Sequence, residues 1–270
     1  MQVGLHELLG HGCGKLLQET SEDVYNFDIE SPPISPLTKK PITSWYTPGQ
    51  TWGSVFGSLA ASYEECRAEC VAMALCCDLG ILAIFGFEGV EASDVLYSAY
   101  LSMARAGIAA LEFWDPKSRK WGQAHMQARF SILQTFLSAG KDFASLDYTK
   151  EDLSDLTIKI DRSKIVSHGR PAVESYLQKL AIYKATADLA AGTKLYNDIT
   201  HVDEWWGTKV RDEVLRQKTP RKVFVQANTV LTRGDNVVLK EYPATAQGMI
   251  QSYADRTYLS ESDVETGPNI

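Results

Sequence analysis

Two histidines and a glutamate stand together near the start of this chain, in the segment HELLGH at positions 6–11. His6 and His11 offer imidazole nitrogens that bind a transition metal, and Glu7 offers a carboxylate that activates a metal-bound water. Zinc peptidases usually carry such a trio on one helix with the histidines four residues apart. The spacing here is five, which indicates zinc chemistry on a modified helix.

The spacing of five has a geometric consequence. Five residues of a regular α-helix turn through about 500°, which would leave His11 roughly 140° away from His6. Both imidazoles can face one ion only if the helix takes in an extra residue, as a π-bulge does, and such bulges cluster at functional sites. Gly10 lies at the insertion point, where the absence of a side chain suits a distorted turn.

A second acidic motif, EECRAE at positions 64–69, can supply a third protein ligand. It lies in an apolar segment, residues 54–79, with the periodicity of a helix. Glu65 and Glu69 are four residues apart and share a face, whereas Glu64 points about 100° away. One of the pair can bind the metal, and the other can hold the free ring nitrogen of a ligating histidine. Glu64 stays open as an alternative ligand.

The two motifs, about fifty residues apart, resemble the dipeptidyl peptidase III family of zinc exopeptidases, peptidase family M49. The resemblance runs through almost the whole chain, to about residue 255. Further matching segments are SWY at 44–46, IFGFEG at 84–89, QAHMQARF at 123–130, DRSKI at 161–165 and RKVFVQ at 221–226. It implies a zinc-dependent enzyme that releases dipeptides from the N-terminus of short peptides.

The resemblance also implies a role for each residue of the two motifs. One zinc ion per chain would be held by His6, His11 and Glu65. Glu7 would be the general base, which takes a proton from the zinc-bound water and delivers it to the leaving amine. Glu69 would orient His6 without binding the metal itself.

Four further residues are candidates through the resemblance. His125 would donate to the tetrahedral intermediate; the alternative, with the resemblance set aside, is an ordinary surface or core histidine. Arg221 and Lys222 match the family's basic pair near the C-terminal side of the substrate. Arg129, one turn from His125, is either an anion contact for the substrate or a solvated charge.

Composition limits the class of protein. The chain has 270 residues, 44% of them apolar, enough to bury a sizeable core. Its net charge of −7 and the lack of a basic run argue against a nucleic-acid partner. The sequence also has no run of about twenty apolar residues, the length that a membrane-spanning helix needs. Four of the five cysteines fall within one predicted helix, which is no disulfide framework, so we expect a cytoplasmic protein. A thiol metal site at Cys66 and Cys70 is the alternative to buried small side chains.

The apolar periodicity predicts a mainly α fold. Prolines break residues 19–50 into loops, and an extended stretch is expected within residues 148–165. The helices expected are residues 2–18, 54–79, 92–113 and 120–140, one from Pro171 to about Ala191, and 203–217.

The pattern changes at Pro220, where we place a domain boundary. Residues 1–220 would form the helical catalytic zinc lobe, N-terminally truncated. Residues 221–270 would contribute a short β-hairpin and helix segment to a second, α+β lobe. The hairpin is expected over 222–242, from Val223 and Val225 onward. Such a hairpin needs further structure to complete it, which the family's two-lobed architecture provides.

Members of the family are far longer than this chain. The resemblance therefore predicts that the partner of this chain is the missing N-terminal part of the same enzyme. That part would contain the residues that bind the free N-terminal amine of the substrate. It also favours a monomer. Two other functions stay open: a zinc hydrolase or endopeptidase of different specificity at the same site, and a non-catalytic peptide-binding fragment.

Overall fold

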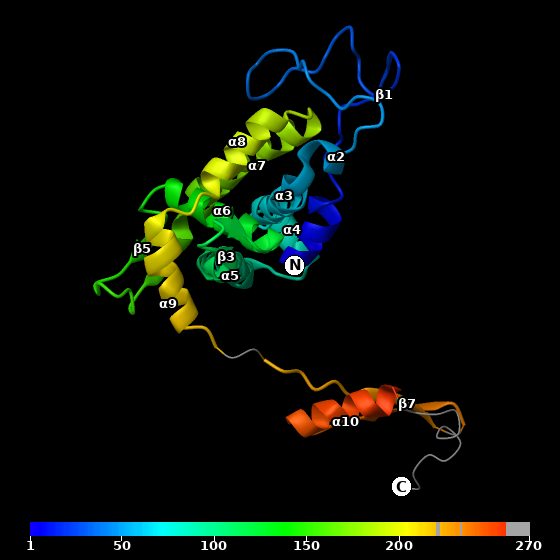
Figure 1. The fold of residues 1–270 in the computed structure, drawn as a ribbon, viewed down its shortest axis with the longest axis vertical. Helices are drawn as coiled ribbons and strands as arrows, with labels where there is room; N and C mark the ends of the chain where they lie inside the picture. Colours follow the sequence, from blue (N-terminus) through cyan, green and yellow to red (C-terminus); the bar gives the residue numbers. More distant parts are fainter. Residues whose placement is uncertain (220–221, 233, 258–270) are drawn as a thin grey trace. The chain divides into compact units, whose positions relative to one another are not determined.

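A computed structural model describes residues 1–219, 222–232 and 234–257 of the chain (Figure 1). The chain divides into two compact units, Met1–Gln217 and Lys218–Ile270. The first unit is helical and holds both motifs predicted to bind a metal. The prediction of a mainly α fold is confirmed, and the assignment of the second unit to another lobe stays a prediction.

The helices of the first unit vary from single turns to twenty-one residues. They are α1 (Gln2–Gly4), the π-helix η1 (Leu5–Gly10), α2 (Trp52–Phe56), η2 (Gly57–Leu59), α3 (Ala60–Leu75), α4 (Leu79–Ile84), α5 (Gly89–Ala109), η3 (Ala110–Phe113), α6 (Ala124–Ser138), η4 (Arg162–Lys164), the π-helix η5 (Ile165–Gly169), α7 (Arg170–Ala185), α8 (Leu189–Ile199), the π-helix η6 (Trp205–Val210) and α9 (Arg211–Arg216). None of the described helices is both long and apolar enough to cross a membrane.

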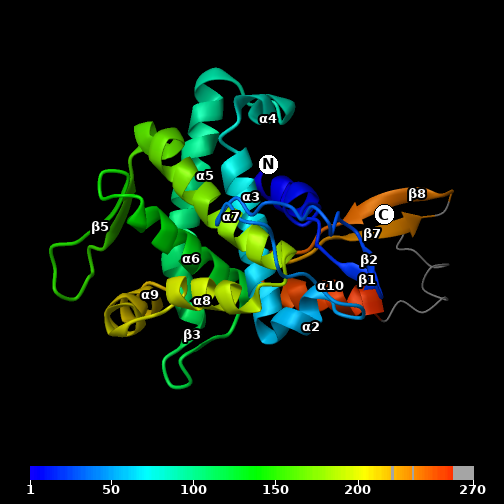
Figure 2. The same cartoon turned by 90° about the horizontal axis from the view of Figure 1, so that it is seen from above.

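Helix α3 is the centre of the first unit, and it packs against η1, α6 and α7 (Figure 2). Its sequence is rich in alanine and cysteine on all sides, and such a helix is buried rather than amphipathic. Tyr63 and Cys66 of α3 are fully buried, as are Tyr100 of α5 and Phe130 of α6. Because α3 carries the EECRAE motif, its carboxylates are attached to a buried central helix.

The first unit also contains three small antiparallel hairpins. They pair β1 (Glu19–Ser21) with β2 (Val24–Tyr25), β3 (Trp114–Asp115) with β4 (Lys120–Trp121), and β5 (Ala144–Asp147) with β6 (Thr157–Ile160). The extended stretch expected within 148–165 is thus β6 alone, and it pairs with residues that precede the expected stretch.

Three expected helix boundaries were wrong. The first helix ends at Gly10 and not near residue 18, because the carbonyl of Gly10 is taken by the Arg67 side chain. The helix expected over 54–79 is broken at Gly57, whose φ of 53° lies in the left-handed region. The helix expected to reach Ala191 ends at Ala185, because Ala187 has a φ of 55° and Asp188 caps the start of α8 by accepting from Ala191 N.

The second unit contains one hairpin and one helix in its described part. β7 (Asn228–Thr232) pairs with β8 (Asn236–Lys240), and α10 (Ala246–Thr257) follows. The buried Asn228 amide donates to Tyr242 Oη and to the carbonyl of Ser252, which ties the hairpin to the helix. Val223 and Val225 precede the first strand, so the hairpin begins later than expected.

Candidate metal centre

The HELLGH segment adopts the π-helical turn that its spacing predicts. The His11 amide donates to the carbonyl of His6 at 3.0 Å, which is the five-residue hydrogen bond of a π-helix. The two imidazole ring centroids lie 4.7 Å apart. The extra residue therefore brings both rings to one side of the helix.

Gly10 allows this helix to lie directly against α3. A Cβ added at Gly10 would lie 2.8 Å from the Cβ of Ala68 and 2.9 Å from its carbonyl oxygen. Backbone atoms of a buried helix cannot move away, so only glycine fits. The close approach sets the distance between the histidines and the carboxylates of α3.

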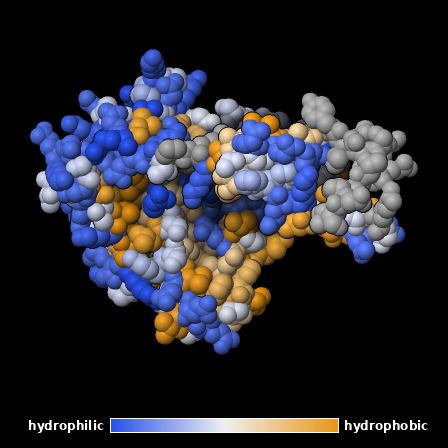
Figure 3. Space-filling view, turned by 90° about the horizontal axis from the view of Figure 1, so that it is seen from below, coloured by the Kyte–Doolittle hydropathy of each residue, from blue (hydrophilic) through white to orange (hydrophobic). Residues whose placement is uncertain are grey.

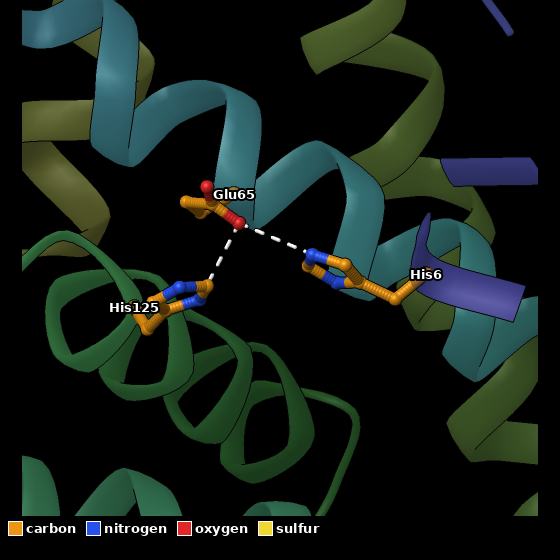
Figure 4. Close-up of side chains that lie close together, drawn as sticks. All are labelled: His6, Glu65 and His125. Carbon is orange, nitrogen blue, oxygen red and sulfur yellow. Dashed lines mark ion pairs between the residues drawn. The ribbon is translucent and has the colours of Figure 1, made fainter. Parts of the chain in front are cut away.

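One carboxylate oxygen of α3 is surrounded by imidazoles. Glu65 Oε2 lies 3.1 Å from His6 Nε2, 3.5 Å from His11 Nε2 and 3.3 Å from His125 Nδ1. Figure 4 shows His6 and His125 approaching Glu65 from two different helices, η1 and α6. The structure thus gathers side chains from three distant parts of the sequence around one point.

The cluster has the composition and the unsatisfied atoms of a metal site. Within the described part of the chain, Glu65 Oε2 and His125 Nδ1 are buried without a hydrogen-bond partner. Buried polar atoms nearly always have a hydrogen-bond partner. Two unpartnered atoms beside each other therefore indicate that a further group, such as a cation, binds between them. Possible ligand atoms lie within 4.8 Å of one another in two sets, His6–Glu65–His125 and His6–Glu7–His11. Imidazole nitrogens with a carboxylate oxygen are a donor set that zinc accepts.

Each histidine of the π-helix has a second carboxylate at its other ring nitrogen. His11 Nδ1 lies 3.2 Å from Glu64 Oε1, and His6 Nδ1 lies 3.8 Å from Glu69 Oε2. A carboxylate at Nδ1 favours the tautomer whose Nε2 lone pair is free, and both Nε2 atoms face Glu65. The sequence reasoning did not find this role for Glu64, although the Arg67 three residues later was a signal that the two side chains pair on the helix.

Glu64 is held as a carboxylate by two cations. Arg67 and Lys184 donate to it, with Lys184 Nζ 2.5 Å from Glu64 Oε2. Burial alone would raise the pKa of Glu64, but the hydrogen bonds from Arg67 and Lys184 outweigh burial and lower that pKa to about 2. Glu64 therefore remains ionised under all ordinary conditions.

The other candidate residues differ in where they lie. Glu7 lies on the π-helix, directly after His6 in the sequence, and its side chain is exposed. Arg129 is paired with Glu69, its Nε and a terminal nitrogen lying 3.2 and 3.1 Å from Glu69 Oε1. Lys222 is exposed and belongs to the second unit, whereas the cluster belongs to the first. Arg221 lies outside the described residues. A role in substrate binding for these three basic residues stays a prediction.

A family model for peptidase family M49 matches residues 1–257 of the chain. The chain belongs to this family. The match includes both motifs of the cluster, so the gathered histidines and glutamates are those of an M49 protein.

The curated relatives carry the name dipeptidyl peptidase 3. The proteins of Mus musculus and Homo sapiens are each 47% identical over 261 residues, and that of Dictyostelium discoideum is 46% identical over 272. These alignments cover 95% or 98% of this chain but only 35% or 38% of the relatives. The chain therefore spans about a third of the length of the relatives.

Two solved structures are also similar. DPP III from Caldithrix abyssi is 16% identical with a TM-score of 0.48, covering 79% of this chain and 31% of that chain. Dipeptidyl-peptidase III from Corallococcus sp. strain EGB is 17% identical with a TM-score of 0.48, covering 80% and 30%.

Proposed function

We propose that this chain carries the zinc centre of an exopeptidase that releases dipeptides from the N-terminus of short peptides. The observation that supports this most directly is the buried Glu65 Oε2 surrounded by three imidazoles in an M49 chain. The proposed ligands are His6, His11 and Glu65. Relatives named dipeptidyl peptidase 3 support the dipeptide product.

The chemistry follows from the residues around the cluster. A zinc ion bound here would polarise the scissile carbonyl and make the attacking water more acidic. Glu7, exposed beside the ligands, accepts a proton from the attacking water and passes it to the leaving amine. His125, on α6 at the edge of the cluster, donates a hydrogen bond to the oxyanion that forms on the substrate.

Residues from outside this chain complete the site in our proposal. Val3 and Leu8, on the helix that carries the proposed ligands, are 73% and 75% exposed. Apolar areas also lie open between hydrophilic ones on the face drawn in Figure 3. Because the relatives are about three times longer, we expect their additional residues to cover the ligand helix and to bind the amine of the substrate.

Replacing Glu7 tests the proposed chemistry. In the full-length enzyme, Glu7→Gln should lower kcat about 10²–10⁴-fold, the usual contribution of a general base, while zinc content stays near one per chain. The matched control is Glu22→Gln, another exposed glutamate that lies away from the motif. A Glu7→Gln enzyme within tenfold of wild-type kcat would contradict the proposal.

Product analysis tests the specificity separately. Digestion of one octapeptide followed by mass spectrometry should yield the N-terminal dipeptide first. Internal fragments from the same wild-type enzyme would instead indicate an endopeptidase that uses the same residues.

A further inference from the structure

We propose that Lys184, in the last turn of α7, is a positioning residue for the metal centre and acts on His11 through Glu64. This inference rests on the proposed zinc site. Lys184 lies 120 residues from Glu64 in the sequence, and neither the motif pattern nor its spacing pointed to it.

Glu64 accepts from as many donors as a carboxylate can. Its Oε2 accepts from Arg67 Nε at 2.9 Å and from Lys184 Nζ at 2.5 Å. Its Oε1 accepts from a terminal nitrogen of Arg67 at 2.5 Å and faces His11 Nδ1 at 3.2 Å. A carboxylate offers about four acceptor positions, so all of them are used. Glu64 therefore cannot turn without losing a charged donor.

Arg67 and Lys184 hold Glu64 from different directions. The Arg67 side chain is 1% exposed and also donates to the Gly10 carbonyl at 2.6 Å, so it fixes Glu64 relative to the π-helix. Lys184 fixes Glu64 relative to α7, whose end is bonded to the segment after the π-helix through Leu17 N and Ala185 O. Lys184 thus connects Glu64 to α7, whereas Arg67 connects it to the π-helix.

The consequence for the metal centre follows from the tautomer of His11. When Glu64 accepts from Nδ1, the lone pair on Nε2 is free and points toward Glu65. Without Lys184, one position on Glu64 Oε2 is left without its donor, and Glu64 keeps only its two bonds to Arg67, which do not fix it relative to α7. The orientation of the His11 ring then becomes less defined, and the ligand set loses preorganisation.

Zinc affinity measures this effect independently of catalysis. For the full 270-residue chain, Lys184→Met should raise the zinc dissociation constant about tenfold in chelator competition, the lower end of the range for residues outside the ligand set. The visible absorption of the cobalt(II)-substituted chain should change as well, because it reports ligand geometry. Lys184→Arg keeps the charge and should restore most of the affinity.

Lys179→Met is the matched control, since Lys179 lies on the same helix and is exposed. It should bind zinc and cobalt as the wild type does. Far-ultraviolet circular dichroism of every variant shows whether the helices are intact, and Lys184→Gln, which also removes the charge, serves if Lys184→Met does not fold.

A double-mutant cycle decides whether Lys184 acts through Glu64. If it does, Lys184→Met should weaken zinc binding far less in a Glu64→Gln background than in the wild type. Equal losses in both backgrounds, or wild-type affinity in Lys184→Met, would overturn the inference while leaving the proposed zinc site intact. A wild-type chain that binds no zinc would instead overturn the proposed site together with this inference.

Discussion

Two neighbouring glutamates of α3 have opposite environments. Glu64 is bound by charged donors on both oxygens, whereas Glu65 Oε2 has no hydrogen-bond donor among the described residues. A saturated carboxylate supports a ligand, and an unsatisfied one is available to a cation. This difference supports the choice of Glu65 over Glu64 as the proposed ligand, although the two are adjacent in the sequence.

The environment of Glu64 makes the stability of the protein depend on pH. Burial raises the pKa of Glu64, but the hydrogen bonds from Arg67 and Lys184 have the larger effect. The pKa therefore falls to about 2, below the ordinary value near 4.5. A lowered pKa contributes stability that is present above the unfolded-state pKa and lost as the pH falls through the folded-state pKa. The ionised carboxylate therefore contributes stability at neutral pH that is lost in strong acid.

Glu64→Gln should therefore reduce the free energy of unfolding at pH 7 and change it much less at pH 2. Urea denaturation of the metal-free chain at both values provides the measurement. An equal loss at both pH values would show that the carboxylate contributes by its shape and not by its charge.

At the scale of helices, the sequence was most informative where chemistry constrained the spacing. Two histidines five apart can serve one site only through a π-turn, and the structure has that turn. The sequence was less informative about where helices end. Asp188 before a run of apolar residues was an available capping signal for α8, but the preceding helical periodicity continued across it.

The contacts of Glu64 could not be predicted from the sequence for a different reason. Helix geometry relates Glu64 to Arg67, three residues away, but nothing local relates it to Lys184 on α7. Such a contact depends on how α7 packs against α3, which is a property of the tertiary fold. The same holds for His125, which only the resemblance to a family brought to the site.

The contact between η1 and α3 gives a prediction at the same scale. Gly10→Ala should destabilise the first unit by about 1–3 kcal/mol, because the added Cβ overlaps the backbone of Ala68. The displaced helix should also bind zinc more weakly. Thermal unfolding and zinc titration provide the two measurements.

Gly53→Ala is the control for this substitution, since a Cβ there meets no atom within 4 Å and Gly53 is also helical. It should be neutral or slightly stabilising. A Gly10→Ala chain as stable as the control would show that η1 can move away from α3 at little cost.

At the scale of the whole molecule, the proposed metal centre lies within one unit. Every predicted ligand lies within Met1–Gln217, as do all six tryptophans. Tryptophan fluorescence therefore reports the unfolding of the first unit alone. Saturating zinc, at about a thousand times its dissociation constant, should stabilise this unit by about 4 kcal/mol and raise its Tm by roughly 10 °C.

Chelation should reverse that increase, and His11→Ala should abolish it. A chain ending at Gln217 should show the same zinc-dependent change as the full chain. Loss of the zinc effect on truncation would mean that the second unit contributes to the centre.

The sequence distance between Lys184 and Glu64 also affects the order in which contacts form during folding. Contacts between residues 120 positions apart form late, because the entropy of closing the intervening chain must be overcome first. The centre is then complete only after most of the first unit has folded, so zinc should slow unfolding without speeding folding. Refolding from urea, followed by tryptophan fluorescence, should proceed at the same rate with and without zinc. A refolding rate that rises with zinc would show that the histidines and Glu65 meet early.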